Sequence, residues 1–259
     1  MSFSNNLVMA FFAGCYIGFG CLLAIKTAGN LPVEVWGGLA RLAFGLVFPL
    51  GLLLVLIAGA DLFTGNCMYL PSAVMNGKAN CTGLLRSWTI SYFGNLAGSI
   101  FVAFFLGTMS EVLFTDEVDG SYPLAASAVS LANMKCSLSW EVAFIRAVGC
   151  NWLVCLAIYM SLAAPDAVSK AVVIWPPIAG FVVIGFEHSV ANMTFIPLGI
   201  FLGQTETYLS SAGPVVLTAG WDDFFIRNLI PVTLGNIAGG MIFVGMLYYK
   251  VMGVKPGNK

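Results

Sequence analysis

Six long apolar segments, separated by short polar stretches, run along the chain. Four of them have about the 20 residues that a helix needs to cross the hydrocarbon core of a bilayer. These four lie at about 7–25, 88–106, 140–163 and 229–249. The second and fifth segments, at about 42–74 and 171–202, are longer and are interrupted by polar residues. The pattern predicts an all-α membrane protein with six transmembrane helices, of which the second and the fifth are broken.

Ionisable and amide side chains interrupt the second and fifth segments. The second contains Asp61 and Asn66, and the fifth contains Glu187, Asn192 and His188, the one histidine of the chain. Lipid offers these groups no hydrogen-bond partners, so they must be buried in protein or line water. We therefore expect discontinuous helices whose polar groups face a cavity or a pore.

The two interruptions follow one spacing, which predicts an internal repeat. Both read Gly-x-acid-x4-Asn-x4-Pro, at 59–71 and at 185–197. The third and sixth segments share Gly-Asn-x-Ala-Gly, at 94–98 and 235–239. We interpret residues 1–259 as one domain with two copies of a unit, about 1–108 and 140–250. Each copy holds three spans, an odd number, so the second copy enters the membrane from the opposite side. Such inverted repeats bring both broken helices to the bilayer midplane.

The composition agrees with the membrane class and excludes others. Hydrophobic residues make up 59% of the chain and charged residues 9%, whereas soluble domains carry roughly 25% charged residues. A net charge of -1 without a basic run gives no sign of a nucleic-acid partner. The seven cysteines show no zinc-like spacing and are interpreted as small core residues. The N-terminus has no basic stretch typical of a cleaved signal peptide.

The distribution of basic residues predicts the orientation. If both ends are cytoplasmic, the inner segments hold one acid, Asp166, and most of the other acids lie in outer loops. The basic residues of the inner segments are Lys78, Arg86, Lys170, Lys250, Lys255 and Lys259. The positive-inside rule therefore favours six spans in the plasma membrane with both termini in the cytoplasm.

His188 is the main candidate for chemistry. The unperturbed pKa of histidine lies near neutrality, and a neutral imidazole facing a pore can donate a hydrogen bond or a proton to a small anion. For Asp61 and Glu187 we favour a structural role, paired to backbone N–H groups or to a cation, because an unpaired buried carboxylate is costly. Considered alone, Lys135 is a solvated loop lysine.

The asparagines are expected to tie broken backbone and neighbouring helices together. The five that fall in the apolar segments are Asn66, Asn95, Asn151, Asn192 and Asn236. Two of them, Asn151 and Asn236, are also expected within reach of His188. The sequence contains no Walker motif, zinc triad or nucleophile elbow, so neither a metal, a cofactor nor an enzymatic reaction is expected.

Five motifs together resemble the formate/nitrite transporter family. They are Ala-Asp-Leu-Phe-Thr-Gly-Asn at 60–66, Phe-Gly-Asn-Leu-Ala-Gly at 93–98, Cys-Asn-Trp-Leu-Val-Cys-Leu-Ala at 150–157, Gly-Phe-Glu-His-Ser-Val-Ala-Asn-Met at 185–193 and Asn-Leu-Ile-Pro-Val-Thr-Leu-Gly-Asn at 228–236. They cover nearly the whole chain in the order of the family. Most of the amphipathic helix that precedes the first span in the family has no counterpart in this sequence.

The resemblance implies an aquaporin-like protomer that assembles in the lipid as a homopentamer, with one pore in each subunit. It assigns His188 as the central pore histidine, Thr64 as the threonine of the first interruption, and Asn151 and Asn236 as asparagines near the pore. Lys135 matches the lysine of the family that approaches the site, which replaces the solvated-loop interpretation.

The resemblance also implies two apolar constrictions around the histidine. Their residues are Phe48, Leu52, Leu62 and Phe181, and the assignment of each residue to one constriction stays open. Lys135 and the half-helix N-termini are expected to attract a small anion. Dry constrictions oppose a bare charge. A proton gained between them turns the anion into a neutral acid.

Formate is the predicted substrate, because 64–69 (Thr-Gly-Asn-Cys-Met-Tyr) and 137–140 (Ser-Leu-Ser-Trp) look most like the formate transporters of methanogens. Nitrite, hydrosulfide, lactate or acetate, and bicarbonate are the alternatives within the family. A neutral-solute pore of the aquaglyceroporin type would need paired Asn-Pro-Ala motifs, and the interruptions carry Phe-Thr-Gly-Asn and Ser-Val-Ala-Asn instead. A membrane enzyme would need a metal cluster or a nucleophile–base pair.

Overall fold

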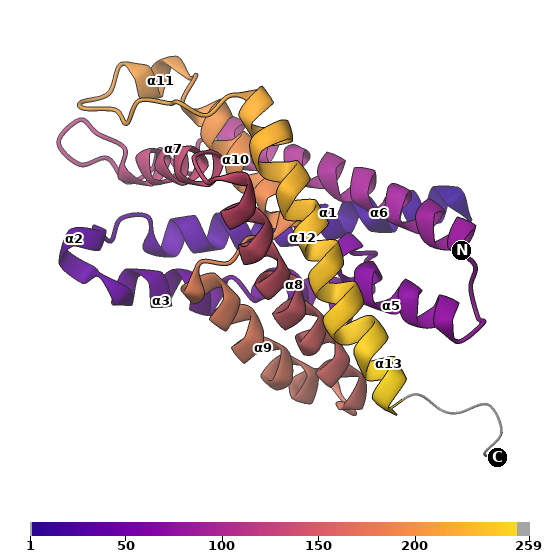
Figure 1. Ribbon diagram of the computed structural model, residues 1–259. Helices are drawn as coiled ribbons and strands as arrows, with labels where there is room; N and C mark the ends of the chain where they lie inside the picture. Colours follow the sequence, from indigo (N-terminus) through magenta and orange to yellow (C-terminus); the bar gives the residue numbers. More distant parts are fainter. Residues whose placement is uncertain (1, 253–259) are drawn as a thin grey trace.

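The computed structural model describes residues 2–252, and helices account for nearly all of the regular structure in that range (Figure 1). Six helical stretches are long and apolar enough to cross a membrane. They are Phe3–Ala28, Gly38–Ala58, Cys81–Met109, Trp140–Ala163, Ala167–Ile184 and Asp223–Met252. The six predicted spans and the all-α class are therefore confirmed.

The first repeat consists of α1 (Phe3–Ala28), α2 (Val33–Trp36), α3 (Gly38–Val47), α4 (Leu50–Ala58), α5 (Phe63–Met75), α6 (Cys81–Phe101) and the π-helix η1 (Val102–Met109). Helix α7 (Pro123–Cys136) connects the repeats. The second repeat consists of α8 (Trp140–Ala163), α9 (Ala167–Ile184), α10 (Ser189–Leu202), α11 (Glu206–Leu209), the π-helix η2 (Asp223–Leu229), α12 (Ile230–Ala238), the π-helix η3 (Gly239–Met246) and α13 (Leu247–Met252).

Both predicted broken helices are present. Helix α4 ends at Ala58 and is followed by the C-cap Gly59, whose φ is 81°; α9 ends at Ile184 and is followed by the C-cap Gly185, whose φ is 85°. Glycine adopts this left-handed conformation without steric cost, which lets the chain leave the helix sharply. Helices α5 and α10 then begin at Phe63 and Ser189. Residues 59–62 are called the first break and residues 185–188 the second break.

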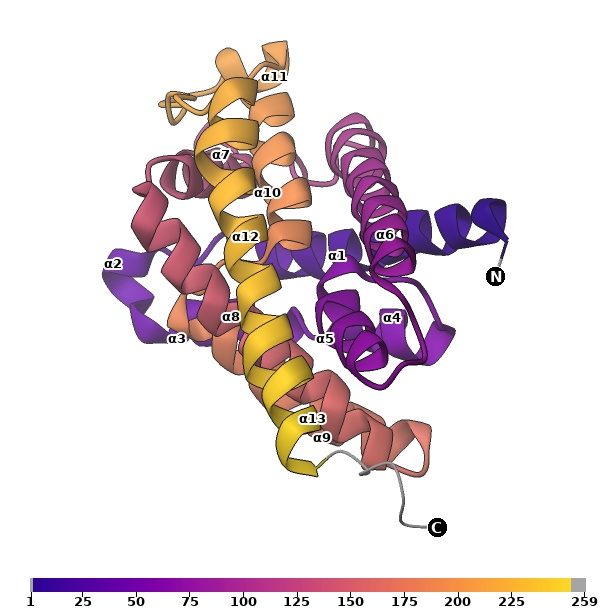
Figure 2. The ribbon, with the colours of Figure 1, turned by 45° about the vertical axis from the view of Figure 1, so that its right-hand side comes forward.

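The repeats are inverted, so consecutive spans place the connections on two opposite faces (Figures 1 and 2). The terminal face carries the start of α1, the connections 76–80 and 164–166, and α13. The far face carries α2, the start of α7 and α11. Helix α4 therefore runs from the far face to the first break, and α9 runs from the terminal face to the second break.

In each repeat, a glycine of the third span brings that span into close contact with the first span of the same repeat. A Cβ on Gly98 of α6 would lie 3.0 Å from the amide nitrogen of Cys15 in α1. A Cβ on Gly239 would collide with the backbone of Val148 in α8. Small residues allow this approach where lipid supplies no hydrophobic drive for helix association. The shared Gly-Asn-x-Ala-Gly motif thus forms one contact twice.

Two connections are shorter than the gaps between the predicted apolar segments. Residues 75–87 separate the second and third predicted segments, but α6 already begins at Cys81 because the side chain of Asn80 accepts a hydrogen bond from the Gly83 amide at 2.8 Å. Residues 26–41 separate the first and second predicted segments, but α1 continues to Ala28 and α3 begins at Gly38. In both cases polar residues occupy helix ends beyond the apolar segment.

Replacing Gly98 by valine is expected to lower the stability by about 1–3 kcal/mol, because the new side chain meets the backbone of α1. Thermal denaturation of the purified protein in detergent measures the effect. Gly38→Ala is the matched control, because nothing lies within 4 Å of a Cβ at that position. Equal melting temperatures for the two variants would contradict the close packing of α6 on α1.

Candidate functional site

The side chain of Asn95 ties the first break to two helices. Its Oδ1 accepts a hydrogen bond from the Phe63 amide at 2.9 Å, at the start of α5. Its Nδ2 donates to the carbonyl oxygens of Ala10 at 2.7 Å and Asp61 at 3.0 Å. One fully buried amide thus satisfies two backbone groups of the break, those of Phe63 and Asp61, and ties the break to the Ala10 carbonyl of α1.

The side chain of Asn236 makes the same three bonds at the second break. Its Oδ1 accepts from the Ser189 amide at 2.8 Å, at the start of α10. Its Nδ2 donates to the carbonyl oxygens of Ala147 at 2.8 Å and Glu187 at 2.9 Å. The two repeats therefore stabilise their broken helices with the same set of hydrogen bonds from an asparagine side chain.

The two acids of the breaks also have equivalent partners. Asn66 donates to Oδ1 of Asp61 at 2.7 Å, and Asn192 donates to Oε2 of Glu187 at 2.7 Å. Glu187 has a second partner that Asp61 lacks, because the ammonium of Lys135 lies 3.0 Å from each of its carboxylate oxygens. The side chains of this ion pair are 9% and 3% exposed. The second repeat thus carries a buried, fully paired carboxylate.

Lys135 lies in the last turn of α7 and not in a loop. Asn228, at the start of the sixth span, holds that turn, since its Nδ2 donates to the Lys135 carbonyl at 2.9 Å. Oδ1 of Asn228 accepts from Asn192 at 2.8 Å. Asn228 was not singled out from the sequence. The signal in the sequence was its place as the first residue of the last of the five motifs. In the structure its side chain is fully buried.

Thr64 and His188 meet at the junction of the half-helices. Oγ1 of Thr64 lies 3.0 Å from Nε2 of His188, and both side chains are buried. Nδ1 of the imidazole accepts a hydrogen bond from the Ala191 amide at 3.0 Å. A backbone N–H can only donate, so Nδ1 carries no hydrogen and the ring hydrogen lies on Nε2. The neutral imidazole therefore donates to the Thr64 hydroxyl.

The amide of Asn151 holds backbone near this junction. Its Nδ2 donates to the carbonyl oxygens of Thr64 at 3.1 Å and Asn236 at 2.7 Å. The thiol of Cys155, one helical turn further along α8, lies 3.5 Å from the same Thr64 oxygen. Among residues 2–252, neither Asn151 nor Asn236 forms a hydrogen bond with His188, although both were expected within its reach. The amide nitrogens of both bond to backbone carbonyls, and Oδ1 of Asn151 accepts from the Cys155 thiol at 3.6 Å.

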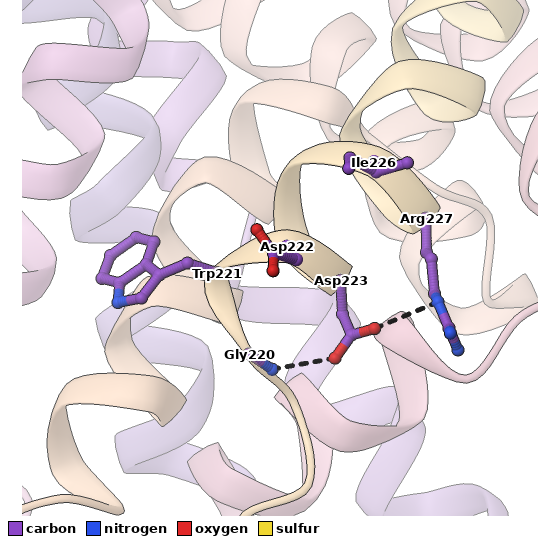
Figure 3. Close-up of a pocket in the computed structure, with 6 residues that line it drawn as sticks. All are labelled: Gly220, Trp221, Asp222, Asp223, Ile226 and Arg227. Atoms are coloured by element: carbon purple, nitrogen blue, oxygen red, sulfur yellow. Dashed lines mark hydrogen bonds and ion pairs between the residues drawn. The ribbon is translucent and has the colours of Figure 1, made fainter.

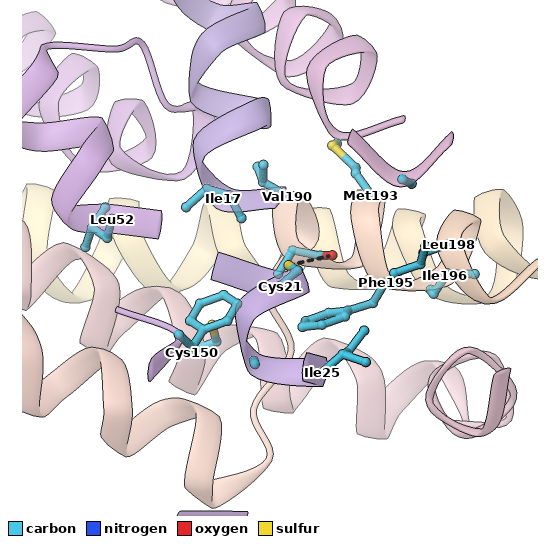
Figure 4. Close-up of a cluster of buried hydrophobic side chains, with 14 of the residues drawn as sticks. Ile17, Cys21, Ile25, Leu52, Cys150, Val190, Met193, Phe195, Ile196 and Leu198 are labelled. Carbon is cyan, nitrogen blue, oxygen red and sulfur yellow. Dashed lines mark hydrogen bonds between the residues drawn. The ribbon is translucent and has the colours of Figure 1, made fainter. Parts of the chain in front are cut away.

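The four residues expected in the constrictions are all buried in the main hydrophobic core, and one of them, Phe181, contacts the imidazole. The rings of Phe48 and Phe181 meet edge to face with centroids 5.8 Å apart, and Phe181 stacks on His188 at 5.9 Å. Leu52 of α4 belongs to the same core (Figure 4). Leu62 precedes α5 as His188 precedes α10, so the two residues occupy equivalent N-cap positions.

A surface hollow of about 630 Å³ lies elsewhere. It is lined by the start of the sixth span on the far face, including Trp221, Asp223 and Arg227 (Figure 3). The Asp223 carboxylate accepts from the Gly220 amide and pairs with Arg227. No sequence-predicted site residue contributes to this hollow. The described part of the chain also holds no group of three or more metal-ligating side chains.

Comparisons with known proteins agree with this architecture. A family model described as formate/nitrite transporter matches residues 1–250. A probable formate transporter of Methanothermobacter thermautotrophicus is 48% identical over 94% of this chain and 87% of its own length. A formate channel of Bacillus thuringiensis is 40% identical over 94% of this chain and 85% of its own length. A solved pentameric formate channel with formate bound has 34% identity and a TM-score of 0.82, covering 96% of this chain and 97% of that chain.

Replacing Asn95 or Asn236 by alanine is expected to lower stability by at least about 2 kcal/mol in each case, because three buried backbone groups lose their partner. Thermal denaturation in detergent compares both variants with Asn5→Ala, whose side chain is exposed. A melting temperature of either variant equal to that of Asn5→Ala would show that the amide does not stabilise its break.

The Lys135–Glu187 pair is expected to behave as a unit. Lys135→Met or Glu187→Leu alone leaves a buried charge without a partner and is expected to cost about 3–5 kcal/mol. The double variant is expected to recover most of that loss. A double-mutant cycle on the thermal unfolding of the protein measures the coupling. Additive losses would contradict the buried pairing.

Proposed function

The chain belongs to the formate/nitrite transporter family, and from this premise we propose that it is a channel for the small monovalent anion of a weak acid, with formate as the substrate. Its multi-pass membrane character and its place among transporters rather than enzymes follow from the family and the six spans. The formate preference is supported by the relatives described as formate transporter and formate channel. Nitrite is the alternative within the same family.

We propose a homopentamer in the plasma membrane with both termini in the cytoplasm. The similar solved structure is described as pentameric. Lys78, Arg86, Lys170 and Lys250 belong to the terminal face, which supports a cytoplasmic location for that face. Lys255 and Lys259 lie outside the described residues. Each protomer is proposed to be one domain made of the repeats 1–108 and 140–250.

The central observation for this proposal is the hydrogen bond between Thr64 and His188 at the junction of two half-helix N-termini. Helix N-termini carry positive partial charge, so this junction favours an anion. Because Nε2–H donates to Oγ1 of Thr64, the threonine hydroxyl hydrogen is left for the substrate. An anion at this point accepts that hydrogen, and it accepts the imidazole hydrogen when it displaces the hydroxyl.

The tautomer of His188 restricts its part in proton transfer. Nδ1 is occupied by the Ala191 amide, so a proton can be added to the ring only if that bond breaks. We propose that His188 holds the anion by hydrogen bonding while a proton from the bulk solution reaches the anion through the water that accompanies it. The neutral acid then passes the apolar residues Phe48, Leu52, Leu62 and Phe181, which oppose a bare charge.

Lys135 is proposed to attract the anion from the far face. Its ammonium is shared with Glu187, so the pair contributes a dipole and little net charge. This arrangement favours entry without holding the anion tightly, as conduction requires. Asn151 and Asn236 are proposed to keep Thr64 and the second break in place through their bonds to backbone.

Flux of formate, nitrite and acetate into proteoliposomes tests the proposed function. Thr64→Ala is expected to reduce formate flux at least about tenfold, since one polar partner of the anion is lost, and Thr64→Ser is expected to retain most of it. His188→Ala is expected to lower formate flux but to leave the dependence of uptake on an imposed pH gradient in place, because the proton reaches the anion through water. Loss of that dependence in His188→Ala would contradict this source of the proton, and wild-type uptake that does not respond to the pH gradient would refute the proton linkage. Glycerol-driven swelling of the wild-type liposomes would instead support a neutral-solute pore.

A further inference from the structure

Phe195 contacts both Phe48, one of the proposed constriction residues, and the Lys135 ammonium, although it belongs to none of the five motifs. It lies on α10, seven residues after His188, and is 4% exposed. Its ring stacks on Phe48 with centroids 6.2 Å apart and an interplanar angle of 26°. Phe48 contacts Phe181, and Phe181 stacks on His188. A continuous row of aromatic rings therefore leads from the imidazole to Phe195.

The face of the Phe195 ring also receives a cation. The Lys135 ammonium lies 5.7 Å from the ring centroid, within the range of a cation–π interaction. The same ammonium lies 3.0 Å from both oxygens of Glu187. The charge of Lys135 is therefore held between the Glu187 carboxylate of the second break and the Phe195 ring of α10. No other residue among 2–252 brings an aromatic face to this ammonium.

The position of Phe195 along α10 places it on the far-face side of the imidazole. Seven residues of α-helix correspond to a rise of about 10 Å. An anion that enters from the far face meets Lys135 before it reaches His188. Figure 4 shows the Phe195 ring reaching from α10 toward the part of α1 that carries Cys21 and Ile25. The ring thus lies between α10, α1 and the junction of α3 and α4 at Phe48, and it faces the Lys135 ammonium.

We infer that Phe195 is a specificity-determining residue of an aromatic constriction that it forms with Phe48 and Phe181, and that its ring limits the anion to the size of formate and fixes the Lys135 ammonium at the entrance. This inference rests on the proposed channel function and adds the residue that selects among monocarboxylates. With Phe48 and Phe181 it forms a wall of three rings. Shortening the ring at 195 opens the wall beside the cation, where acetate or lactate needs room for its additional carbon atoms.

Proteoliposome flux of formate, acetate and lactate tests the inference. Phe195→Leu is expected to raise the acetate-to-formate flux ratio by about tenfold, because one or two methylene equivalents of space are worth a factor of this order. It is also expected to raise the formate concentration that gives half-maximal flux, because the cation–π contact is lost. Phe195→Tyr keeps the ring and is expected to restore both values.

Phe224→Leu is the matched control. Phe224 is fully buried and packs against Trp221 and Phe225, and among residues 2–252 no aromatic or cation–π contact joins it to Lys135 or His188. Its replacement is expected to change the amount of folded protein but not the flux ratio. Phe195→Met replaces Phe195→Leu if the leucine variant does not yield folded protein, since methionine fills irregular space.

Two outcomes overturn the inference. If Phe195→Leu changes formate and acetate flux by the same factor, Phe195 only fills the core. If Phe224→Leu shifts the ratio as much, the effect is a general loosening of the protein. Failure of the proposed function is distinguishable, because wild-type liposomes would then pass none of the three anions faster than empty ones.

Discussion

The structure depends on how two helices can be broken in a medium without water. At each break one asparagine amide, Asn95 or Asn236, binds two backbone groups of the break and one carbonyl of a neighbouring helix, with bonds of 2.7–3.0 Å. Without these bonds, the N–H and C=O groups of the break would cost several kcal/mol in hydrocarbon. The half-helices α5 and α10 can therefore begin near the middle of the protein, and their N-termini can face one another.

The inverted repeats supply a symmetric scaffold, and a few differences between them supply the chemistry. The N-cap of α5 is the apolar Leu62, whereas the N-cap of α10 is His188. Asp61 is paired with one amide, whereas Glu187 also holds Lys135. The proposed polar site thus uses the second repeat for its imidazole, the connecting helix α7 for its cation and the first repeat for its hydroxyl. A symmetric pair of breaks would offer an anion no such difference between its two sides.

The sequence predicts the fold almost completely, because a bilayer allows few ways to satisfy backbone groups. Span lengths, the two breaks and the inverted repeat all follow from that constraint. Helix ends such as Cys81 were missed, since a cap at Asn80 and not hydropathy decides them. The partner of Lys135 lies 52 positions away, so its pairing depends on tertiary packing. Phe195 has the sequence signature of any core aromatic, and only its neighbours distinguish it.

The first turns of the two half-helices are each held by the other repeat. Asn151 of the second repeat donates to the Thr64 carbonyl at 3.1 Å, and Ser99 of the first repeat donates to the Val190 carbonyl at 3.3 Å. Thr64 and Val190 occupy equivalent positions, each two residues after its N-cap. A displacement of one repeat relative to the other would therefore pull on both first turns at once. Since Thr64 and His188 come from different repeats, these crossed bonds maintain the 3.0 Å contact between them.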